Sequence, residues 1–159
     1  MSDVSLYVAA AAGVAGGSIP AIVNAIRDGR RAKREQRNRQ IETERQACLD
    51  LLAAASELRA RVASAASCHG DEIDARLEHI RDLEAAIHIH AASIAFLTPE
   101  DVAQPAGSVA DAASRLVKST EEKVDRNAKQ LVEPPSSQEL DDSVRDFQDS
   151  AVKYTRARS

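Results

Sequence analysis

A chain of 159 residues is long enough for one domain and a short additional segment. Its net charge of −4 combines two regions of opposite sign. Residues 27–39 hold seven basic and two acidic side chains, whereas the residues from Gln40 onward hold 14 basic and 22 acidic ones, a net −8. An acidic body with few aromatic residues and no tryptophan argues against a nucleic-acid-binding protein. The two cysteines are typical of reduced cytoplasmic thiols and not of a disulfide framework.

Residues 4–26 form a run of 23 residues without charge. At a rise of about 1.5 Å per residue, a helix of this length measures about 34 Å, which is enough to cross a hydrocarbon core of about 30 Å. The sequence therefore predicts a single transmembrane helix within residues 1–26. The alternative interpretation is an Ala-rich helix that forms the core of a soluble helical oligomer.

The basic residues follow the uncharged run, whereas a cleaved secretory signal carries its positive charges before it. Basic residues close to a span stay on the cytoplasmic side of the membrane. We therefore expect an uncleaved, single-pass anchor in the cell membrane, with the N-terminus outside and the C-terminal domain in the cytoplasm.

Small residues recur at every fourth position of the uncharged run, which places them along one face of a helix. Gly13 and Gly17 form a GxxxG pair within this series. The pattern predicts a helix-association face on which a second helix, such as that of another copy of the chain, approaches closely. Its members are Ala9, Gly13, Gly17, Ala21 and Ala25.

Residues 27–40 form a basic juxtamembrane segment, called the collar below. Each Lys or Arg close to a membrane gains about 1 kcal/mol from anionic headgroups. The collar predicts lipid contacts through Arg27, Arg30, Arg31, Lys33, Arg34, Arg37 and Arg39. The alternative is a topology determinant whose arginines lie in solvent. We expect no nucleic-acid partner, because no aromatic residue is interleaved for base stacking.

Two helices are predicted to follow the collar. A heptad pattern predicts a bundle helix over about residues 41–67, with two seams formed by Ile41, Cys48, Ala55 and Val62 and by Glu44, Leu51, Leu58 and Ala65. Gly70 offers a left-handed cap in the following turn. The second helix, residues 71–97, carries one apolar face on Ile73, Leu77, Ile80, Ile87, Ala91 and Ile94. The short connection predicts an antiparallel hairpin.

The next segment is predicted to contain two helices. Thr98 as N-cap and Pro99 at the first helical position predict a helix start, and Pro105 and Gly107 are expected to end that helix soon afterwards. A longer helix over about residues 108–132 has sparse apolar positions, so we expect it to be largely solvated.

The last predicted helix covers about residues 136–156. Pro134 and Pro135 precede it, and Ser136 with Glu139 matches a capping box. Its apolar stripe consists of Leu140, Val144, Phe147, Ala151 and Tyr154. This stripe predicts docking onto the bundle or, as the functional alternative, a helix face that binds a partner protein.

Catalytic and metal-binding chemistry has no supporting motif in this sequence. The residue types that bind metals are Cys48, Cys68, His69, His79, His88 and His90. His88 and His90 are two apart, and on a helix two such rings point about 200° away from each other. Because no phosphate-binding glycine loop, nucleophile elbow or metal-ligand spacing occurs either, we expect no enzymatic activity, cofactor or metal.

Over roughly its first sixty residues, the chain resembles small membrane-anchored helical proteins of high-GC bacteria that have no characterised activity. The resemblance consists of the Ala/Gly-rich run, the Arg-rich collar and the segment ERQACLDLLAAASELR at residues 44–59. It implies no particular chemistry.

These observations predict an all-α protein, with one transmembrane helix followed by a cytoplasmic antiparallel bundle of about four helices over residues 41–159. The predicted function is a membrane-anchored interaction or scaffold module with lipids, an unidentified protein and other copies of itself as partners. Two alternatives remain open. One is an oligomerising membrane effector that perturbs the bilayer, which the glycines, Pro20 and Asn24 motivate, and the other is the soluble helical oligomer.

Overall fold

The structure is a computed structural model that describes the backbone of residues 3–125, 128 and 130–158 and the side chains of residues 31–125, 128 and 130–158. Four helices and one short two-stranded hairpin make up this part of the chain. The predicted all-α class is therefore confirmed. The chain divides into two compact units, Met1–Thr43 and Glu44–Ser159.

Helix α1, Asp3–Ala65, includes the whole of the first unit that is described and continues into the second. No Gly or Pro occurs between Gly29 and Gly70, so nothing in the sequence interrupts the helix there. Among the residues that the structure describes, no helix is both long and apolar enough to cross a membrane. The transmembrane helix predicted at residues 4–26 thus gains no support: its backbone is helical, and its side chains lie outside the described part.

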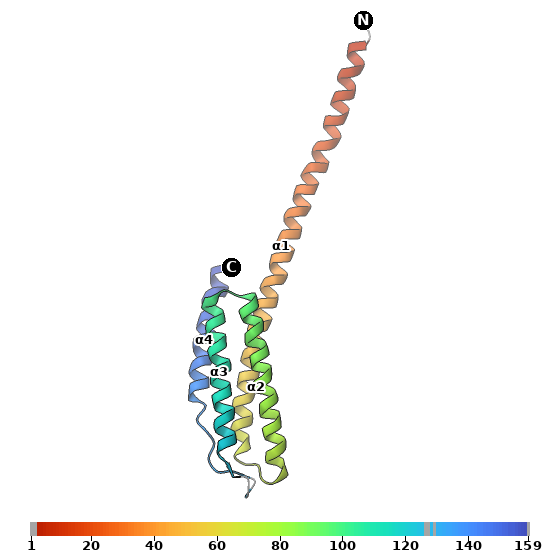
Figure 1. Ribbon diagram of the computed structural model, residues 1–159. Helices are drawn as coiled ribbons and strands as arrows, with labels where there is room; N and C mark the ends of the chain where they lie inside the picture. Colours follow the sequence, from red (N-terminus) through yellow and green to blue (C-terminus); the bar gives the residue numbers. More distant parts are fainter. Residues whose placement is uncertain (1–2, 126–127, 129, 159) are drawn as a thin grey trace. The chain divides into compact units, whose positions relative to one another are not determined.

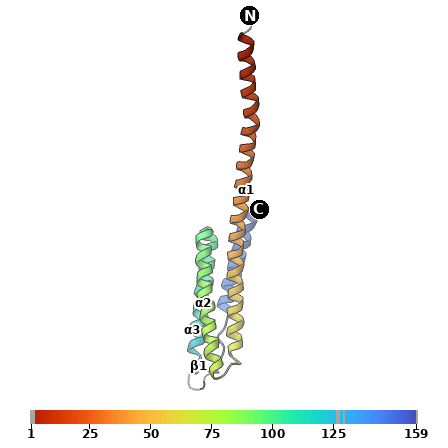
Figure 2. The same cartoon turned by 90° about the vertical axis from the view of Figure 1, so that its right-hand side faces the viewer.

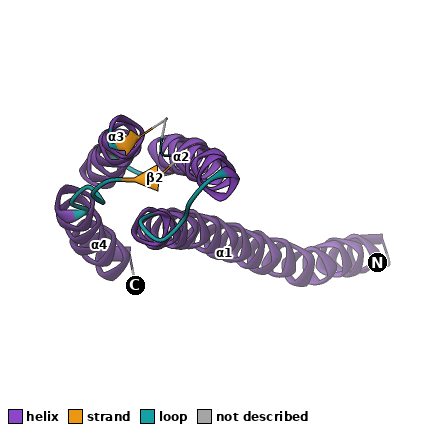
Figure 3. Cartoon of the chain, turned by 90° about the horizontal axis from the view of Figure 1, so that it is seen from below, coloured by secondary structure: helices purple, strands orange, loops and turns teal. Residues whose placement is uncertain are grey.

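The second unit is an antiparallel four-helix bundle, as predicted. It contains α1 from Glu44 onward, α2 (Asp71–Leu97), α3 (Glu100–Glu122) and α4 (Gln138–Arg158). Figure 1 and Figure 2 show these four helices side by side with alternating directions, and Figure 3 views them along their axes. The order around the bundle is α1, α2, α3, α4, so α4 closes the ring against α1.

The core follows the predicted helix faces closely in α1 and α2. Six apolar residues predicted for the buried face of α2 are all buried: Ile73, Leu77, Ile80, Ile87, Ala91 and Ile94. In α1 one seam buries Glu44, Leu51, Leu58 and Ala65. In the other seam Ala55 and Val62 are buried, whereas Ile41 and Cys48 are half-buried. The heptad interpretation as a bundle helix is therefore confirmed.

Helix α3 differs from the prediction, because it continues through Pro105 and Gly107. A proline inside a helix removes one backbone hydrogen bond and costs about 3 kcal/mol. Fully buried Val102, Ala106 and Val109 flank this point, and burying a valine alone gains about 1.5–3 kcal/mol. Packing on both sides of the proline therefore offsets its local cost. The expectation of a largely solvated helix was also wrong, since nine residues of α3 are buried.

The predicted helix over residues 108–132 ends early, at Glu122. A hairpin follows, in which β1 (Val124–Asp125) pairs antiparallel with β2 (Gln130–Leu131). In the hairpin Leu131 is buried, and the half-buried Val124 packs against the same core. The Asp125 carboxylate accepts a hydrogen bond from the backbone N–H of Ala128, which stabilises the turn.

Two predicted helix caps take different roles in the structure. Thr98 caps the end of α2, where its hydroxyl and its backbone N–H both donate to the carbonyl of Ile94, and Pro99 precedes α3 instead. Ser136 accepts a hydrogen bond from the N–H of Gln138. Because α4 begins at Gln138, the capping position is Ser137, one residue after the predicted cap. The predicted capping-box partner Glu139 points elsewhere, since its carboxylate pairs with Arg115 at 2.8 Å.

Largely exposed polar contacts join each pair of neighbouring helices around the ring, three of them ion pairs and one a histidine–carboxylate contact. They are Glu57–His79 (3.5 Å), Arg81–Glu121 (2.6 Å), Arg115–Glu139 (2.8 Å) and Arg59–Asp141 (2.9 Å). Exposed pairs of this kind contribute about 0–1 kcal/mol each, because water screens the charges and the side chains lose freedom. They favour this arrangement of the helices, while the apolar core supplies most of the stability.

Replacing glycine with alanine is expected to have opposite effects on the stability of the protein at Gly107 and at Gly70. Neither Gly70 nor Gly107 has another atom within 4 Å of an added Cβ, but Gly70 has a φ of 62°, where L side chains are strained. We expect Gly107→Ala to stabilise the protein by about 0.5–1 kcal/mol. Gly70→Ala should destabilise it by about 1–3 kcal/mol. Urea unfolding followed by circular dichroism measures both, and equal effects would contradict the left-handed conformation at Gly70.

Candidate interaction site

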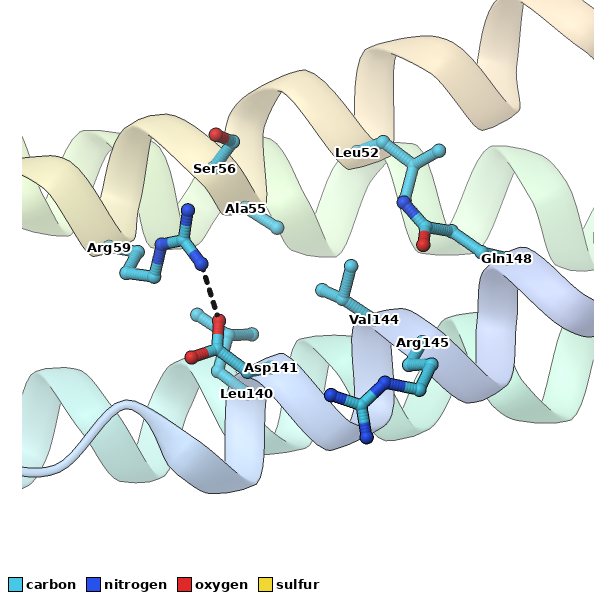
Figure 4. A pocket seen from close by; sticks show the side chains of 9 residues that line it. All are labelled: Leu52, Ala55, Ser56, Arg59, Leu140, Asp141, Val144, Arg145 and Gln148. Carbon is cyan, nitrogen blue, oxygen red and sulfur yellow. Dashed lines mark hydrogen bonds and ion pairs between the residues drawn. The ribbon is translucent and has the colours of Figure 1, made fainter.

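A groove of about 390 Å³ lies between α1 and α4. Its apolar lining comes from Leu52 and Ala55 of α1 and from Leu140 and Val144 of α4. Figure 4 shows Arg59 and Asp141 facing each other across one end, where their ion pair measures 2.9 Å. The polar side chains of the lining are Ser56, Arg59, Asp141, Arg145 and Gln148. An apolar floor with polar rims is the usual form of a site that receives a side-chain stripe of a ligand or partner.

The groove follows from the sequence pattern of both helices. Small Ala55 stands in the buried seam of α1, and Val144 of α4 is only half-buried beside it, so the two helices leave space between them. Leu52 and Gln148 border the same space. The sequence offered no direct signal for this site, because its two walls are more than eighty residues apart and neither wall alone is concave.

A second polar feature joins α1 to the end of α4 and is called the clasp below. Glu44 is only 4 % exposed, and its Oε2 accepts hydrogen bonds from the Tyr154 hydroxyl (3.2 Å) and from Nη1 of Arg158 (2.5 Å). Arg158 also donates to the Tyr154 hydroxyl and lies over its ring, 5.2 Å from the centroid. The clasp supplies a buried carboxylate with a charged partner, which a buried charge requires.

The clasp changes the acid–base behaviour of its members. Burial raises the pKa of the Tyr154 phenol, and the negative charge of Glu44 raises it further, whereas Arg158 acts in the opposite direction. The hydrogen bond to Glu44 raises the pKa of Arg158. Burial also raises the pKa of the nearby Cys48 thiol, to which Glu44 adds a smaller contribution. These groups therefore keep their protons at neutral pH, which suits a structural role.

The apolar stripe predicted on the last helix packs onto the bundle. Leu140 and Phe147 are buried, and the other members, Val144, Ala151 and Tyr154, are half-buried against the core. The docking interpretation therefore describes this face in the structure. The interpretation of Leu140, Val144, Phe147, Ala151 and Tyr154 as a partner-binding face stays a prediction, and it would require α4 to leave the core.

The predicted membrane-facing residues are only partly described. The helix-association face of Ala9, Gly13, Gly17, Ala21 and Ala25 and the first two collar residues, Arg27 and Arg30, lie outside the residues whose side chains the structure describes. The other five collar residues are exposed: Arg31, Lys33, Arg34, Arg37 and Arg39. Arg31 pairs with Glu35 at 3.4 Å along the same helix face.

The histidines and cysteines are distributed over the bundle. Within the described residues no three His, Cys, Asp or Glu side chains are arranged to hold a metal ion. His88 contacts the Ser114 hydroxyl at 2.8 Å, and His79 lies beside Glu57, whose pKa is lowered by hydrogen bonds from Arg61 and His79. Cys68 is buried and donates to the carbonyl of Ser64. The structure thus gives His79, His88 and Cys68 contacts within the bundle.

Comparison of the chain with protein-family models, with curated proteins and with solved structures finds no match.

Removal of the clasp carboxylate should loosen the end of α4. We expect Glu44→Gln to destabilise the bundle by about 1–3 kcal/mol, because it removes a charge-assisted acceptor for two buried or half-buried donors. Amide hydrogen exchange should increase most near Tyr154 and Arg158. Glu42→Gln, which changes an exposed residue two positions earlier, is the matched control. An equal effect of both substitutions would contradict the clasp.

The raised pKa of Cys48 should appear in its alkylation by iodoacetamide. Its thiolate should form at higher pH than that of N-acetylcysteine, so the rate at neutral pH should be lower. Glu44→Gln should lower this midpoint only partly, because burial is the larger cause. Since the folded-state pKa exceeds the unfolded one, the thiol's contribution to stability is full below the unfolded pKa and is lost as the pH rises through the folded pKa. Mass spectrometry separates Cys48 from Cys68, and a midpoint equal to that of N-acetylcysteine would contradict the effect.

Proposed function

We propose that this chain is a membrane-anchored helical module that binds another protein and holds it at the membrane surface. In this proposal the uncharged run of residues 4–26 forms a single-pass anchor with the N-terminus outside. The collar contacts anionic headgroups on the cytoplasmic side, and the four-helix bundle presents the interaction surface.

The observation that carries the proposal is the order of features along one helix. An uncharged run of 23 residues is followed at once by the collar. Every residue from 31 to 40 is exposed. An exposed, polar helical segment suits a spacer beside a charged surface. At about 1 kcal/mol per basic residue, the five described collar residues alone supply about 5 kcal/mol of attraction to anionic lipid.

The bundle supports the interaction part of the proposal. Its four helices bury their apolar faces against each other, including the stripe of α4, so the unit is complete without further helices. The groove between α1 and α4 is a concave surface that this packing leaves open. A rigid helical scaffold with an open groove is well suited to recognition of a partner segment.

Fractionation of the full chain tests the anchoring. In a bacterial host the tagged protein should remain in the membrane after an alkaline carbonate wash, and its C-terminal tag should be protected from protease in spheroplasts. Replacing the five described collar residues (Arg31, Lys33, Arg34, Arg37 and Arg39) with glutamine should reduce this protection, because the charge asymmetry that sets the orientation is removed.

The matched control removes five positive charges from the exposed surface of the bundle, at Arg81, Arg115, Lys118, Arg145 and Lys153. It should leave both membrane retention and tag protection unchanged. Recovery of the wild-type chain in the soluble fraction without detergent would overturn the anchor. Residues 4–26 would then be interpreted as the core of a soluble helical oligomer.

A further inference from the structure

We propose that the groove between α1 and α4 binds an amphipathic helix of a partner protein, with the partner's apolar stripe on the groove floor and its flanking carboxylates facing four arginines. This inference rests on the proposed role as an interaction module, and it adds the surface and the class of partner.

The apolar floor extends beyond the groove itself. Leu49 and Val152 are large apolar side chains that are 49 % and 48 % exposed. Leu49 precedes the groove residue Leu52 by three positions, and Val152 follows the groove residue Gln148 by four, so each lies on the groove side of its own helix. Because α1 and α4 run antiparallel, both extend the same end of the groove. Two exposed apolar residues on facing helices, in line with a groove, form a continuous docking strip.

The length of this strip suits a short helix. On α1 it runs from Leu49 to Arg59, which at about 1.5 Å per residue corresponds to about 15 Å, or roughly three helical turns. Apolar side chains at i, i+3, i+4, i+7 and i+11 of a partner helix extend over about 16.5 Å and cover that distance. The area of such a contact is below that of a standard protein–protein interface, so we expect micromolar affinity.

The charges around the strip select the partner. Arg59 lines the groove at one end, and Arg145 lies further along α4, with its guanidinium turned away from α1 (Figure 4). At the other end, Arg45 precedes Leu49 by four residues and Arg156 follows Val152 by four, which places each arginine one turn beyond an exposed apolar residue. Four arginines thus flank the strip, although the chain from Gln40 onward has a net charge of −8. The carboxylates beside it are Asp141 in the lining and, by the same spacing, Asp149, three residues before Val152.

Two of these arginines already form ion pairs with carboxylates of this chain, and the carboxylates of a partner helix would compete with those pairs. Asp141 pairs with Arg59 at 2.9 Å, and Asp142 pairs with Arg145 at 3.3 Å. Both pairs are partly or largely exposed, and such pairs contribute about 0–1 kcal/mol. Carboxylates of a docking helix can therefore replace or join them at small cost. A second copy of the chain is disfavoured, because two identical grooves facing each other across a two-fold axis bring their arginines together.

Two synthetic helices of eighteen residues test the proposal. They share one leucine stripe at i, i+3, i+4 and i+7 spacing and differ only in their flanking residues, which are all Glu in one and all Lys in the other. Fluorescence anisotropy measures their binding to the full chain, held in phosphatidylcholine nanodiscs if it fractionates with membranes and in buffer if it is soluble. We expect the Glu helix to bind at least about tenfold more tightly than the Lys helix, a difference of about 1.4 kcal/mol. Empty nanodiscs give the background.

Paired variants locate the binding on the chain. Leu49→Lys with Val152→Lys should weaken binding of the Glu helix at least about tenfold. The matched control, Ile89→Lys with Val132→Lys, changes two residues that are 66 % and 70 % exposed elsewhere on the bundle and should leave the affinity within about twofold. Arg45→Gln with Arg156→Gln should abolish most of the preference for Glu over Lys flanks. All of these positions are exposed, and circular dichroism confirms folding of each variant.

Several outcomes overturn the proposal. They are absence of binding by the Glu helix, equal binding of both helices, equal loss in the control pair, and self-association that disappears with Leu49→Lys and Val152→Lys. Displacement of the Glu helix by phosphatidylglycerol vesicles, dependent on the same four arginines, would assign the groove to lipid instead. Fractionation alone tests whether the chain is anchored in the membrane. If the chain is not anchored, the binding experiment still tests the groove, and if the Glu helix does not bind, the proposed membrane anchor is unaffected.

Discussion

Burial of two side chains of α4, Leu140 and Phe147, closes the bundle. Both lie in the core formed by α1, α2 and α3, and Phe147 is the largest fully buried side chain of the described residues. Burial of an apolar side chain of this size gains about 1.5–3 kcal/mol, so the two residues supply much of what keeps α4 in place. The groove and the clasp each need α4 as one wall or one partner, and both therefore depend on this contact.

The remainder of the core is built from small and aliphatic residues. In α3 four alanines are buried, namely Ala106, Ala110, Ala112 and Ala113, and small side chains allow neighbouring helices to approach closely. Small side chains pack closely but bury little apolar area per residue. Polar contacts at the ends of the helices therefore contribute a larger share of the stability of the bundle. The clasp fulfils this role at one end of α4, where a largely buried Glu44 is neutralised by Arg158 and hydrogen-bonded by Tyr154.

The outer surface of the bundle combines an acidic net charge with a local concentration of arginines along the α1–α4 groove. Interaction surfaces are distinguished by such local departures in charge and apolarity, and less by the average composition of the surface. The collar is a second basic region on the same chain, and its residues from 31 to 40 are exposed. The proposed function connects the two regions, with one directed to lipid and the other to protein.

Much of the fold was predictable from periodicity. The buried faces of α2 and of α1 from Leu51 onward matched the predicted apolar positions, because a long helix with one apolar stripe has a single low-energy way to bury it. The predictions failed where local propensity and packing disagreed. Pro105 and Gly107 indicate a break, but Val102, Ala106 and Val109 offset their cost by burial. After Glu122 the chain forms a hairpin in which Leu131 and Val124 both contact the core, and no local pattern in the sequence indicates this change from helix.

The sequence contained one indication of the contacts between α1 and α4 that the sequence analysis did not use. Glu44 occupies a seam otherwise made of Leu51, Leu58 and Ala65, and a carboxylate in an apolar seam requires a partner. The sequence by itself determined the all-α class, the buried faces of the first two bundle helices and the separation of basic and acidic regions, because these depend on residues close together along the chain. Only the tertiary structure decided the partner of Glu44, the continuity of α3 and the groove between α1 and α4. Those features depend on side chains that lie far apart in sequence and meet only when the helices pack.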